Sequence, residues 1–257
     1  MQVKCMTVYP DVKINLGLHV LRRRPDGYHD LETLFVPFRG MGDRIDIEES
    51  DRASIEIIGG DWNPETDLSW RAYRLLSEEF GLPPLRIVLH KSAPVGAGLG
   101  GGSADAAFTL KALNSMFSLG LDEAGLASRA AMLGSDCPFF IYDRPMFGEG
   151  RGEVLTPWGI DLSGYEIRVE VPQGVKVSTK EAYSGLELSR AGARVQLKEA
   201  LSRPVEEWRG VVTNDFEQSV FASHPQIAAL KEQFYAEGAV YSSMSGSGSA
   251  VFALFRK

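Results

Sequence analysis

The feature of this sequence that most constrains its fold is a glycine-rich run between residues 94 and 107. The run reads Pro-Val-Gly-Ala-Gly-Leu-Gly-Gly-Gly-Ser-Ala-Asp-Ala-Ala, with five glycines among the seven residues 96–102. Glycine adopts positive φ without strain, so successive backbone N–H groups can converge on one point. Apolar residues then recur at helical spacing, which predicts a helix whose first turn has N–H groups free to bind an anion. We therefore predict a phosphate-binding loop, with Ser103 as the helix N-cap or as a phosphate ligand.

Three other interpretations of the glycine run fit less well. Residues 96–101 satisfy the dinucleotide-binding pattern G-x-G-x-x-G, but the acidic residue expected about 20 residues later, at the end of a second strand, is missing. Asp122 and Glu123 stand at that distance and open a predicted helix instead. A Walker A loop would end in Gly-Lys-Ser or Gly-Lys-Thr, and no lysine stands there. A flexible linker does not usually run into an amphipathic helix.

Composition and charge limit the class of protein. The chain has 257 residues, of which 44% are hydrophobic and 24% charged, enough for a sizeable core in one large domain or two joined domains. No apolar run reaches the length of a membrane span, and the first residues lack the apolar core of a signal peptide. We therefore expect a cytoplasmic protein without a membrane partner. The net charge of −7 argues against a nucleic-acid partner, and Cys5 and Cys137 are expected to be reduced, buried thiols.

Strict alternation over residues 12–20 predicts a β-strand with one apolar face. Its other face carries Lys13, Asn15, Gly17 and His19. This second face is either a small polar platform or a solvent-exposed strand surface.

A basic loop follows, reading Arg-Arg-Arg-Pro-Asp-Gly-Tyr-His over residues 22–29. Its Pro-Asp-Gly sequence is a turn signal. The arginines form a solvated face or help to hold an anionic substrate. Tyr28 and His29 either stack on a base or pack against the protein.

One acidic residue stands in apolar surroundings that make an unpaired charge costly. Asp136 lies between a glycine and a proline in the segment Gly134-Ser-Asp-Cys-Pro-Phe-Phe140. Since an isolated buried charge is unfavourable, Asp136 is either a helix cap or a catalytic carboxylate paired with a cation. Lys13 is a candidate for that cation.

Periodicity and turn residues predict the remaining elements. Strands are expected at residues 33–39, 44–49, 53–58, 85–90 and 166–171, and helices at 66–80, 122–133, 192–202, 216–221 and 226–237. Gly81 is the expected C-cap of the first helix, and Ser178 with Glu181 has capping-box spacing before a short helix. A hairpin is expected at residues 146–155, and a strand, a glycine/serine turn and a strand at residues 238–255.

Taken together, three segments resemble the markers of the GHMP kinases, a family of small-molecule kinases. They are the strand Lys13–Val20, the loop Pro94–Ala107 and the turn Met244–Ser249, in the family's order. The resemblance implies an α+β, two-lobed fold with an ATP-loop lobe over residues 1–160, a second lobe over 161–257 and the active site in the cleft. The implied nucleotide-binding residues are Pro94, Val95, Gly96, Ala97, Gly98, Leu99, Gly100, Gly101, Gly102, Ser103 and Ala104.

Further motifs resemble one branch of this family. They read Lys-Ile-Asn-Leu from residue 13, Asp-Gly-Tyr-His from residue 26, Gly-Gly-Gly-Ser from residue 100 and Gly-Ser-Asp-Cys-Pro-Phe from residue 134. That branch transfers the ATP γ-phosphate to the C2 hydroxyl of a cytidine diphosphate-linked methylerythritol, in isoprenoid precursor synthesis. The resemblance therefore implies ATP and Mg²⁺ as cofactors, a small-molecule substrate, and a monomer or weak homodimer.

The resemblance also implies roles for individual residues. Asp136 would accept the hydroxyl proton, while Lys13 would keep that carboxylate ionised and steady the transferring phosphoryl group, since phosphoryl transfer depends on alignment and charge stabilisation. Tyr28 and Tyr183 would sandwich the cytosine ring, and His29 would contact its polar edge. The implied substrate contacts are Asn15, Tyr28, His29, Thr179 and Tyr183.

The sequence departs from the family pattern at two places. Pro10-Asp11-Val12 precedes Lys13 where Ala-Pro-Ala is usual, and Ala104 replaces a common serine, so the metal ligands are not assigned. Two other functions remain as alternatives: a GHMP kinase for another small alcohol, and a catalytically silent sugar or nucleotide sensor. Retention of both Lys13 and Asp136 disfavours the sensor, because a binding module needs no base.

Overall fold

The computed structural model describes residues 4–186 and 195–257 and divides the chain into two compact units. Unit 1 comprises Met1–Val12, Pro37–Val95 and Gly100–Arg144, and unit 2 comprises Lys13–Val36, Gly96–Leu99 and Pro145–Lys257. The units are not contiguous in sequence because the strands β2 (Asp11–Arg23) and β3 (His29–Gly42) each contribute residues to both. The expected boundary after residue 160 therefore falls inside unit 2.

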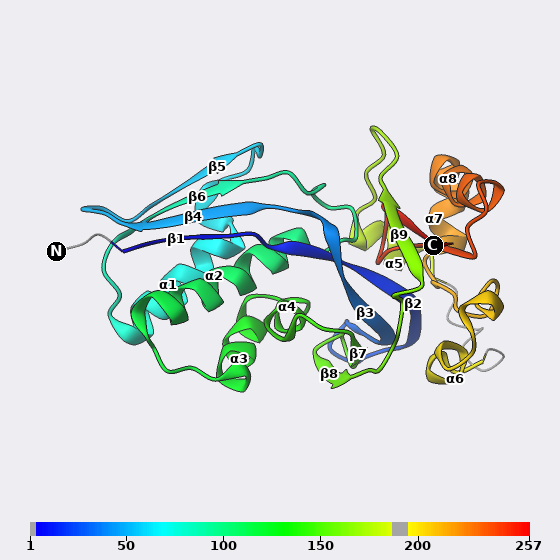
Figure 1. Ribbon diagram of the computed structural model, residues 1–257, viewed down its shortest axis with the longest axis horizontal. Coiled ribbons are helices and arrows are strands. Elements are labelled where there is room, and N and C mark those ends of the chain that lie inside the picture. Colours follow the sequence, from blue (N-terminus) through cyan, green and yellow to red (C-terminus); the bar gives the residue numbers. More distant parts are fainter. Residues whose placement is uncertain (1–3, 187–194) are drawn as a thin grey trace. The chain divides into compact units, whose positions relative to one another are not determined.

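Unit 1 is a sheet with helices (Figure 1). The sheet has the strand order β1-β4-β6-β5, in which β5 and β6 are parallel and the other neighbours are antiparallel. Its strands are β1 (Cys5–Val8), β4 (Arg44–Glu49), β5 (Ser54–Ile58) and β6 (Leu85–His90). Its helices are η1 (Pro64–Thr66), α1 (Leu68–Phe80), α2 (Gly101–Phe117), α3 (Glu123–Leu133) and α4 (Cys137–Tyr142).

The core of unit 1 follows from alternation in the strands. Ile45 and Ile47 of β4 and Ile87 of β6 are at most 1% exposed, while the residues between them carry charges or lie nearer the surface. Helix α2 packs against both α1 and β1, which covers this apolar face of the sheet. Each fully buried aliphatic side chain contributes about 2 kcal/mol through burial.

Local signals in the sequence set several helix ends of unit 1. The Asp67 side chain accepts a hydrogen bond from Ser69 N, so α1 begins two residues later than predicted, after the short η1 turn. Gly81 ends α1 in the left-handed conformation with φ 68°, as predicted. Asp122 caps α3 by accepting from Gly125 N at 2.7 Å.

Unit 2 contains two sheets, ordered β2-β3-β7-β8 and β10-β11-β9. Its other strands are β7 (Met146–Glu149), β8 (Val154–Pro157), β9 (Tyr165–Glu170), β10 (Tyr241–Met244) and β11 (Val251–Arg256). Its helices are α5 (Thr179–Ser184), α6 (Leu197–Leu201), η3 (Val205–Glu207), α7 (Glu217–Ser223) and α8 (Pro225–Ala236). The expected hairpin and the expected C-terminal strand pair are confirmed, while the expected helix over 192–202 lies partly outside the described residues. The α+β fold class is confirmed.

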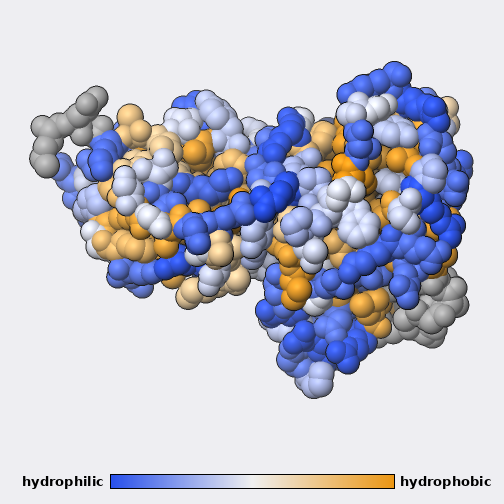
Figure 2. Space-filling model, turned by 60° about the horizontal axis from the view of Figure 1, so that its bottom comes forward, coloured by the Kyte–Doolittle hydropathy of each residue, from blue (hydrophilic) through white to orange (hydrophobic). Residues whose placement is uncertain are grey.

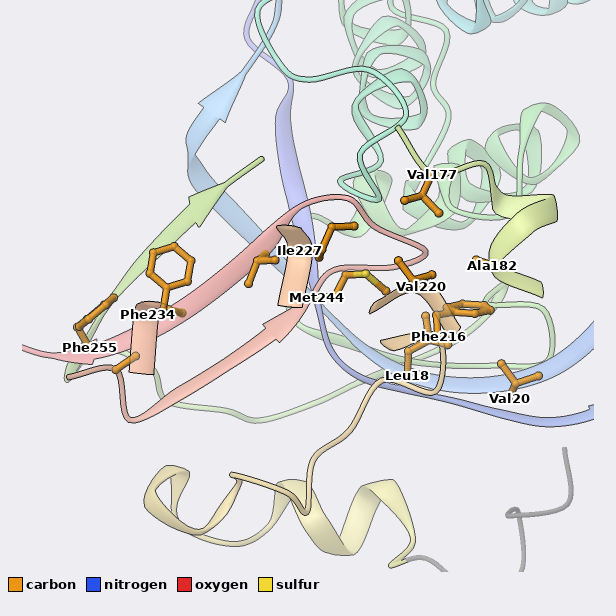
Figure 3. Close-up of a cluster of buried hydrophobic side chains, with 13 residues drawn as sticks. Leu18, Val20, Val177, Ala182, Phe216, Val220, Ile227, Phe234, Met244 and Phe255 are labelled. Carbon is orange, nitrogen blue, oxygen red and sulfur yellow. The ribbon is translucent and has the colours of Figure 1, made fainter. Parts of the chain in front are cut away.

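A buried apolar cluster joins the elements of unit 2 (Figure 3). It combines side chains from β2, α5, α7, α8, β10 and β11 with others from the loops between them, including Leu18, Val20, Ala182, Phe216, Val220 and Met244. Tyr183 packs against this cluster from α5. The cluster thereby fixes the helix that carries two of the predicted substrate contacts, Thr179 and Tyr183.

The polar face of β2 is buried, so its interpretation as a solvent-exposed surface is wrong. Lys13 is 3%, Asn15 2% and His19 0% exposed. His19 contacts Glu32 Oε1 through Nδ1 and Thr213 Oγ1 through Nε2, both at 3.1 Å. Because a buried polar group is costly without a partner, this face forms a satisfied polar platform.

The surface carries interspersed polar and apolar residues on the face that Figure 2 shows. Cys137 is buried as expected. Cys5 is exposed, because its position on β1 faces away from the covered side of the sheet. Of the helices in the described part of the chain, none combines the length and apolar character that crossing a membrane requires.

A buried charge cluster of Asp43, Lys91 and Asp105 lies in unit 1. Lys91 Nζ donates to Asp43 Oδ2 at 2.5 Å and to Asp105 Oδ2 at 2.7 Å. Its side chain is 4% exposed, and those of both aspartates 1%. Burial raises the pKa of Asp105 to about 8, a rise that Lys91 opposes and that the nearby Asp43 and Asp67 reinforce. Asp105 is therefore mainly neutral at pH 7.

We predict that Asp105 makes the free energy of unfolding pH-dependent. Its folded pKa of about 8 lies above the usual value of 3.8, so this contribution to stability is fully present below pH 3.8. It is lost as pH rises toward 8, with a slope of at most about 1.4 kcal/mol per pH unit. Denaturant unfolding of the wild type and Asp105→Asn at pH 5 and pH 8.5 should show the wild type losing stability relative to the variant. Equal pH dependence of the two proteins would contradict the prediction.

Candidate active site

The glycine run forms a loop that leads directly into α2. Gly96, Gly98 and Gly100 have φ values of 71°, 77° and 73°, in the region that favours glycine. Gly100 is the N-cap of α2, and its carbonyl accepts from Ala104 N at 2.9 Å. The prediction of Ser103 as N-cap is therefore wrong, because the left-handed Gly100 starts the helix three residues earlier. Ser103 lies in the first helical turn, where its role as a phosphate ligand stays a prediction.

The backbone of this loop is accessible at two of its glycines. A Cβ atom built on Gly96 or Gly102 would meet nothing within 4 Å. The first-turn N–H groups of α2 have no acceptor within the helix and carry a partial positive charge. The loop therefore fits the phosphate groups of a nucleotide.

Residues from all three marker segments meet at the Gly98 carbonyl, within unit 2. Lys13 Nζ donates to Gly98 O at 2.8 Å, and Ser245 Oγ donates to the same oxygen at 3.0 Å. Lys13 Nζ also donates to Asn15 Oδ1 at 2.5 Å. The main chain follows the same pattern, since Lys13 N donates to Leu99 O at 3.0 Å. Two predicted site residues, Lys13 and Asn15, are thus brought to the predicted loop.

Gly98 is required by this packing. A Cβ atom there would lie 2.1 Å from Ser245 O, so no other residue fits without displacing the backbone. Asn15 is held from its other side, because its Nδ2 donates to Thr33 Oγ1 at 3.0 Å. Thr33 in turn donates to Gly17 O at 2.6 Å. The amide of Asn15 therefore has a fixed orientation.

Two residues that the sequence interpretation missed hold the C-terminal turn. Asn214 Nδ2 donates to Met244 O and to Gly246 O, both at 2.8 Å. Glu217 Oε1 accepts from Met244 N at 2.8 Å and from Ser243 Oγ at 2.9 Å. The only local signal is the run Asn-Asp-Phe-Glu over residues 214–217, which also matches an ordinary helix start.

Asp136 lies in unit 1 at the N-cap position of α4, but its side chain makes no capping hydrogen bond. The interpretation of Asp136 as a capping side chain is therefore not supported. Within unit 1, α4 packs against α2, and Ser103 in the first turn of α2 acts on the side chain of Cys137, the residue after Asp136. Burial raises the pKa of the Cys137 thiol to about 11, so it is protonated at pH 7 and unsuited to nucleophilic chemistry. Since Lys13 belongs to unit 2, its pairing with Asp136 stays a prediction.

The predicted base-binding residues lie in unit 2, on two aromatic contacts. The rings of His29 and Tyr183 stack with centroids 4.6 Å apart and an interplanar angle of 24°. Tyr28 is 56% exposed, and the Arg151 guanidinium lies over its ring at 5.0 Å. Burial, followed by the positive charge of Arg23, lowers the pKa of His29. Its ring is therefore neutral at pH 7, with one nitrogen donor and one acceptor.

Two further predicted features have clear places in unit 2. Thr179 is the first residue of α5, where Ser178 Oγ accepts from Glu181 N at 3.1 Å, so half of the expected capping box is present. In the basic loop, Arg22 and Arg24 both pair with Asp30. The Arg22 side chain is 77% exposed and that of Arg24 33%, so both lie at the solvated surface while they pair with Asp30.

No metal ligand can be assigned from these side chains. Within residues 4–186 and 195–257, no group of three or more His, Cys, Asp or Glu side chains is arranged to hold a metal ion. Buried Asp105 Oδ1 has no hydrogen-bond partner, but its carboxylate belongs to the Lys91 cluster.

The sequence matches known proteins along nearly its whole length. It matches the GHMP kinases N terminal domain over residues 67–144 and the GHMP kinases C terminal domain over residues 195–257. It is 48% identical to 4-diphosphocytidyl-2-C-methyl-D-erythritol kinase of Bacteroides thetaiotaomicron, covering 97% of this chain and 92% of that relative. It is 45% identical to the protein of the same name from Porphyromonas gingivalis, covering 98% and 93%.

Solved structures agree with this match. A crystal structure of 4-(cytidine 5'-diphospho)-2C-methyl-D-erythritol kinase superposes with a TM-score of 0.81 at 34% identity, covering 97% of this chain and 90% of that one. The homoserine kinase of Cytophaga hutchinsonii superposes with a TM-score of 0.74 at 17% identity, covering 98% and 85%, and shows a shared fold. The chain belongs to the GHMP kinase family and, within it, to the 4-diphosphocytidyl-2-C-methyl-D-erythritol kinases.

Proposed function

We propose that this protein transfers the γ-phosphate of ATP to the C2 hydroxyl of 4-diphosphocytidyl-2-C-methyl-D-erythritol, giving the 2-phosphate and ADP in isoprenoid precursor synthesis. The observation that carries the proposal is the meeting of Lys13 and Ser245 at the Gly98 carbonyl of the glycine loop. The substrate follows from relatives of that name at 45–48% identity over nearly the full chain. We place the activity in the cytoplasm, in a monomer or weak homodimer, with small molecules as its only partners.

The glycine loop is the proposed binding segment for the ATP phosphates. Residues 94–104 present accessible backbone at Gly96 and Gly102 and end in the N-terminal turn of a 17-residue helix. Backbone N–H groups and the helix dipole both favour the phosphate charge. Mg²⁺ bound with the nucleotide would neutralise charge on the phosphate oxygens.

Asp136 and Lys13 are the proposed catalytic residues. The Asp136 carboxylate, beside the first turn of α2, would accept the proton of the C2 hydroxyl as the oxygen attacks phosphorus. Lys13 would stabilise the charge on the transferring phosphoryl group, and Asn15, whose amide is fixed by Thr33, would orient the substrate. In this division of roles the protein forms no covalent bond to the substrate. It contributes to catalysis mainly by positioning the two reactants.

The aromatic residues are the proposed cytosine site. Tyr28 and Tyr183 would stack on the ring, as every base has a π-face that an aromatic side chain can cover. His29 is neutral at pH 7 and would exchange hydrogen bonds with the polar edge of the base. Arg151 lies over the Tyr28 ring, and the Tyr183 ring contacts both His29 and Phe216, so both tyrosines have neighbours that hold their rings in place. Thr179, exposed at the start of α5, would add a polar contact.

The test is ADP release with MgATP against a panel of acceptors: the cytidyl methylerythritol, free methylerythritol phosphate, homoserine, mevalonate and galactose. We expect release with the cytidyl compound alone. Release with another acceptor would keep the kinase and overturn the substrate. Silence across the panel, with ATP still bound, would favour a catalytically silent sensor.

Asp136→Asn should lower kcat by about 100-fold to 10,000-fold, the usual contribution of a general base. Asparagine has the same shape but cannot accept the proton, so the dissociation constant for MgATP should change less than about twofold. Steady-state kinetics and nucleotide binding measure the two effects. The matched control is Asp143→Asn at the other end of α4, which should keep its turnover. A variant at residue 136 with most of its activity would exclude Asp136 as the base.

Tyr28→Ala should raise the KM for the cytidyl substrate about fivefold to 150-fold, because stacking on one base contributes about 1–3 kcal/mol. The KM for ATP should stay unchanged, since the loop is not altered. Tyr28→Phe keeps the ring and serves as the control. An unchanged KM for the cytidyl substrate in Tyr28→Ala would disprove the stacking role.

A further inference from the structure

The buried cluster of Asp43, Lys91 and Asp105 has no role in the proposed mechanism. It brackets the phosphate loop on both sides. On the entry side, Asp43 Oδ1 accepts from Ser92 N at 2.7 Å and from Ala93 N at 2.9 Å. These are the two residues directly before the loop, which begins at Pro94.

On the exit side, the same cluster reaches into α2. Lys91 Nζ, held by Asp43 at 2.5 Å, also donates to Asp105 Oδ2 at 2.7 Å. Asp105 lies in α2 directly after Ala104, the last of the residues 94–104 that are proposed to bind the nucleotide. Lys91 directly follows β6, and its ammonium group binds a residue of α2. This hydrogen bond therefore connects the two ends of the segment 94–104.

The Lys91 ammonium also lies next to Gly101, the first residue of α2. A Cβ atom built on Gly101 would stand 3.5 Å from Lys91 Nζ and 3.6 Å from Asp43 Oδ2. The charged groups thus contact the start of the helix whose N–H groups are proposed to bind phosphate. A displacement of Lys91 would move that helix end.

Stability alone is a weak reason for such a cluster. Burying a lysine with a carboxylate and a mainly neutral carboxylic acid costs desolvation energy that their interactions only partly return, and apolar residues of similar size often stabilise a fold as well. The hydrogen bonds, by contrast, have fixed directions and lengths. The cluster therefore fixes the relative positions of its residues, which an apolar core would not do.

We propose that Asp43, Lys91 and Asp105 are positioning residues that hold the entry and the exit of the phosphate loop in the geometry that binds the nucleotide. The inference rests on the proposed function, because it assigns ATP to this loop. It adds that nucleotide affinity depends on a buried ion cluster which itself need not touch the nucleotide.

The experiment measures binding of MgATP and of a non-hydrolysable ATP analogue to the full chain by calorimetry, together with the KM of both substrates and the melting temperature. Lys91→Met removes the bridge and keeps most of the volume. We expect its nucleotide affinity to fall about tenfold or more, while the KM for the cytidyl substrate changes less than twofold. The control is Arg129→Met, which breaks the Arg129–Glu79 ion pair between α3 and α1 in the same unit and should leave nucleotide affinity unchanged.

Two variants at one position separate positioning from packing. Asp105→Asn keeps an oxygen acceptor for Lys91 and imitates the neutral acid, so it should bind MgATP within about threefold of the wild type. Asp105→Leu keeps the branching at Cγ, with a larger side chain, but removes the acceptor, and should weaken binding as Lys91→Met does. This pair also decides the matter if Lys91→Met does not fold.

The outcomes separate the two proposals. A wild type that does not bind MgATP would overturn the proposed function. A wild type that binds, with folded Lys91→Met or Asp105→Leu binding equally well, would overturn the positioning role alone. Equal losses in the affinity for both substrates would also overturn it, because they would indicate a general defect in folding.

Discussion

The close approach of two backbone segments, at Gly98 and Ser245, is the constraint on which the candidate site depends. A side chain on Gly98 would collide with Ser245 O, and one on Gly246 would lie 2.9 Å from Gly98 O. The contact is continued by Ala250 N, which donates to Ala97 O at 3.0 Å. Only because these two backbone segments touch can the Lys13 ammonium and the Ser245 hydroxyl share one carbonyl oxygen.

The fold does not by itself choose the substrate. Homoserine kinase has the same fold at low sequence identity, and one fold regularly serves several reactions. The roles proposed above for the glycine loop and for Lys13 concern phosphoryl transfer in general. The proposal therefore assigns selection of the acceptor to other side chains: His29, the Tyr183 ring that stacks on it, and the exposed Tyr28.

Local signals made much of the fold predictable. The caps at Gly81 and Asp122, the hairpin after residue 146 and the entry of the glycine loop into a helix all depend on residues close in sequence. The beginning of α2 was misplaced because a left-handed glycine served as N-cap in preference to Ser103. That choice depends on the backbone conformation of the loop, which the residue types alone do not fix.

Non-local packing accounts for the rest. The polar face of β2 is covered by residues such as Glu32, Thr213 and Ser245, and nothing near Lys13 in the sequence indicates them. For the same reason the roles of Asn214 and Glu217 were missed, since both act on a turn some 30 residues away. The resemblance to a family indicated which segments matter, but not which partners hold them.

The sequence distance between these partners has a consequence for the order of events during synthesis of the protein. Asn15 and Ser245, which meet in the site, are separated by 230 residues. A ribosome adds about 5–20 residues per second, so roughly ten to fifty seconds pass between their synthesis. During that time the nascent chain carries a lysine and an amide on a strand whose covering turn has not been made. Completion of the site therefore waits for synthesis of the C-terminal turn, and until then the polar face of β2 lacks the partner that Ser245 supplies.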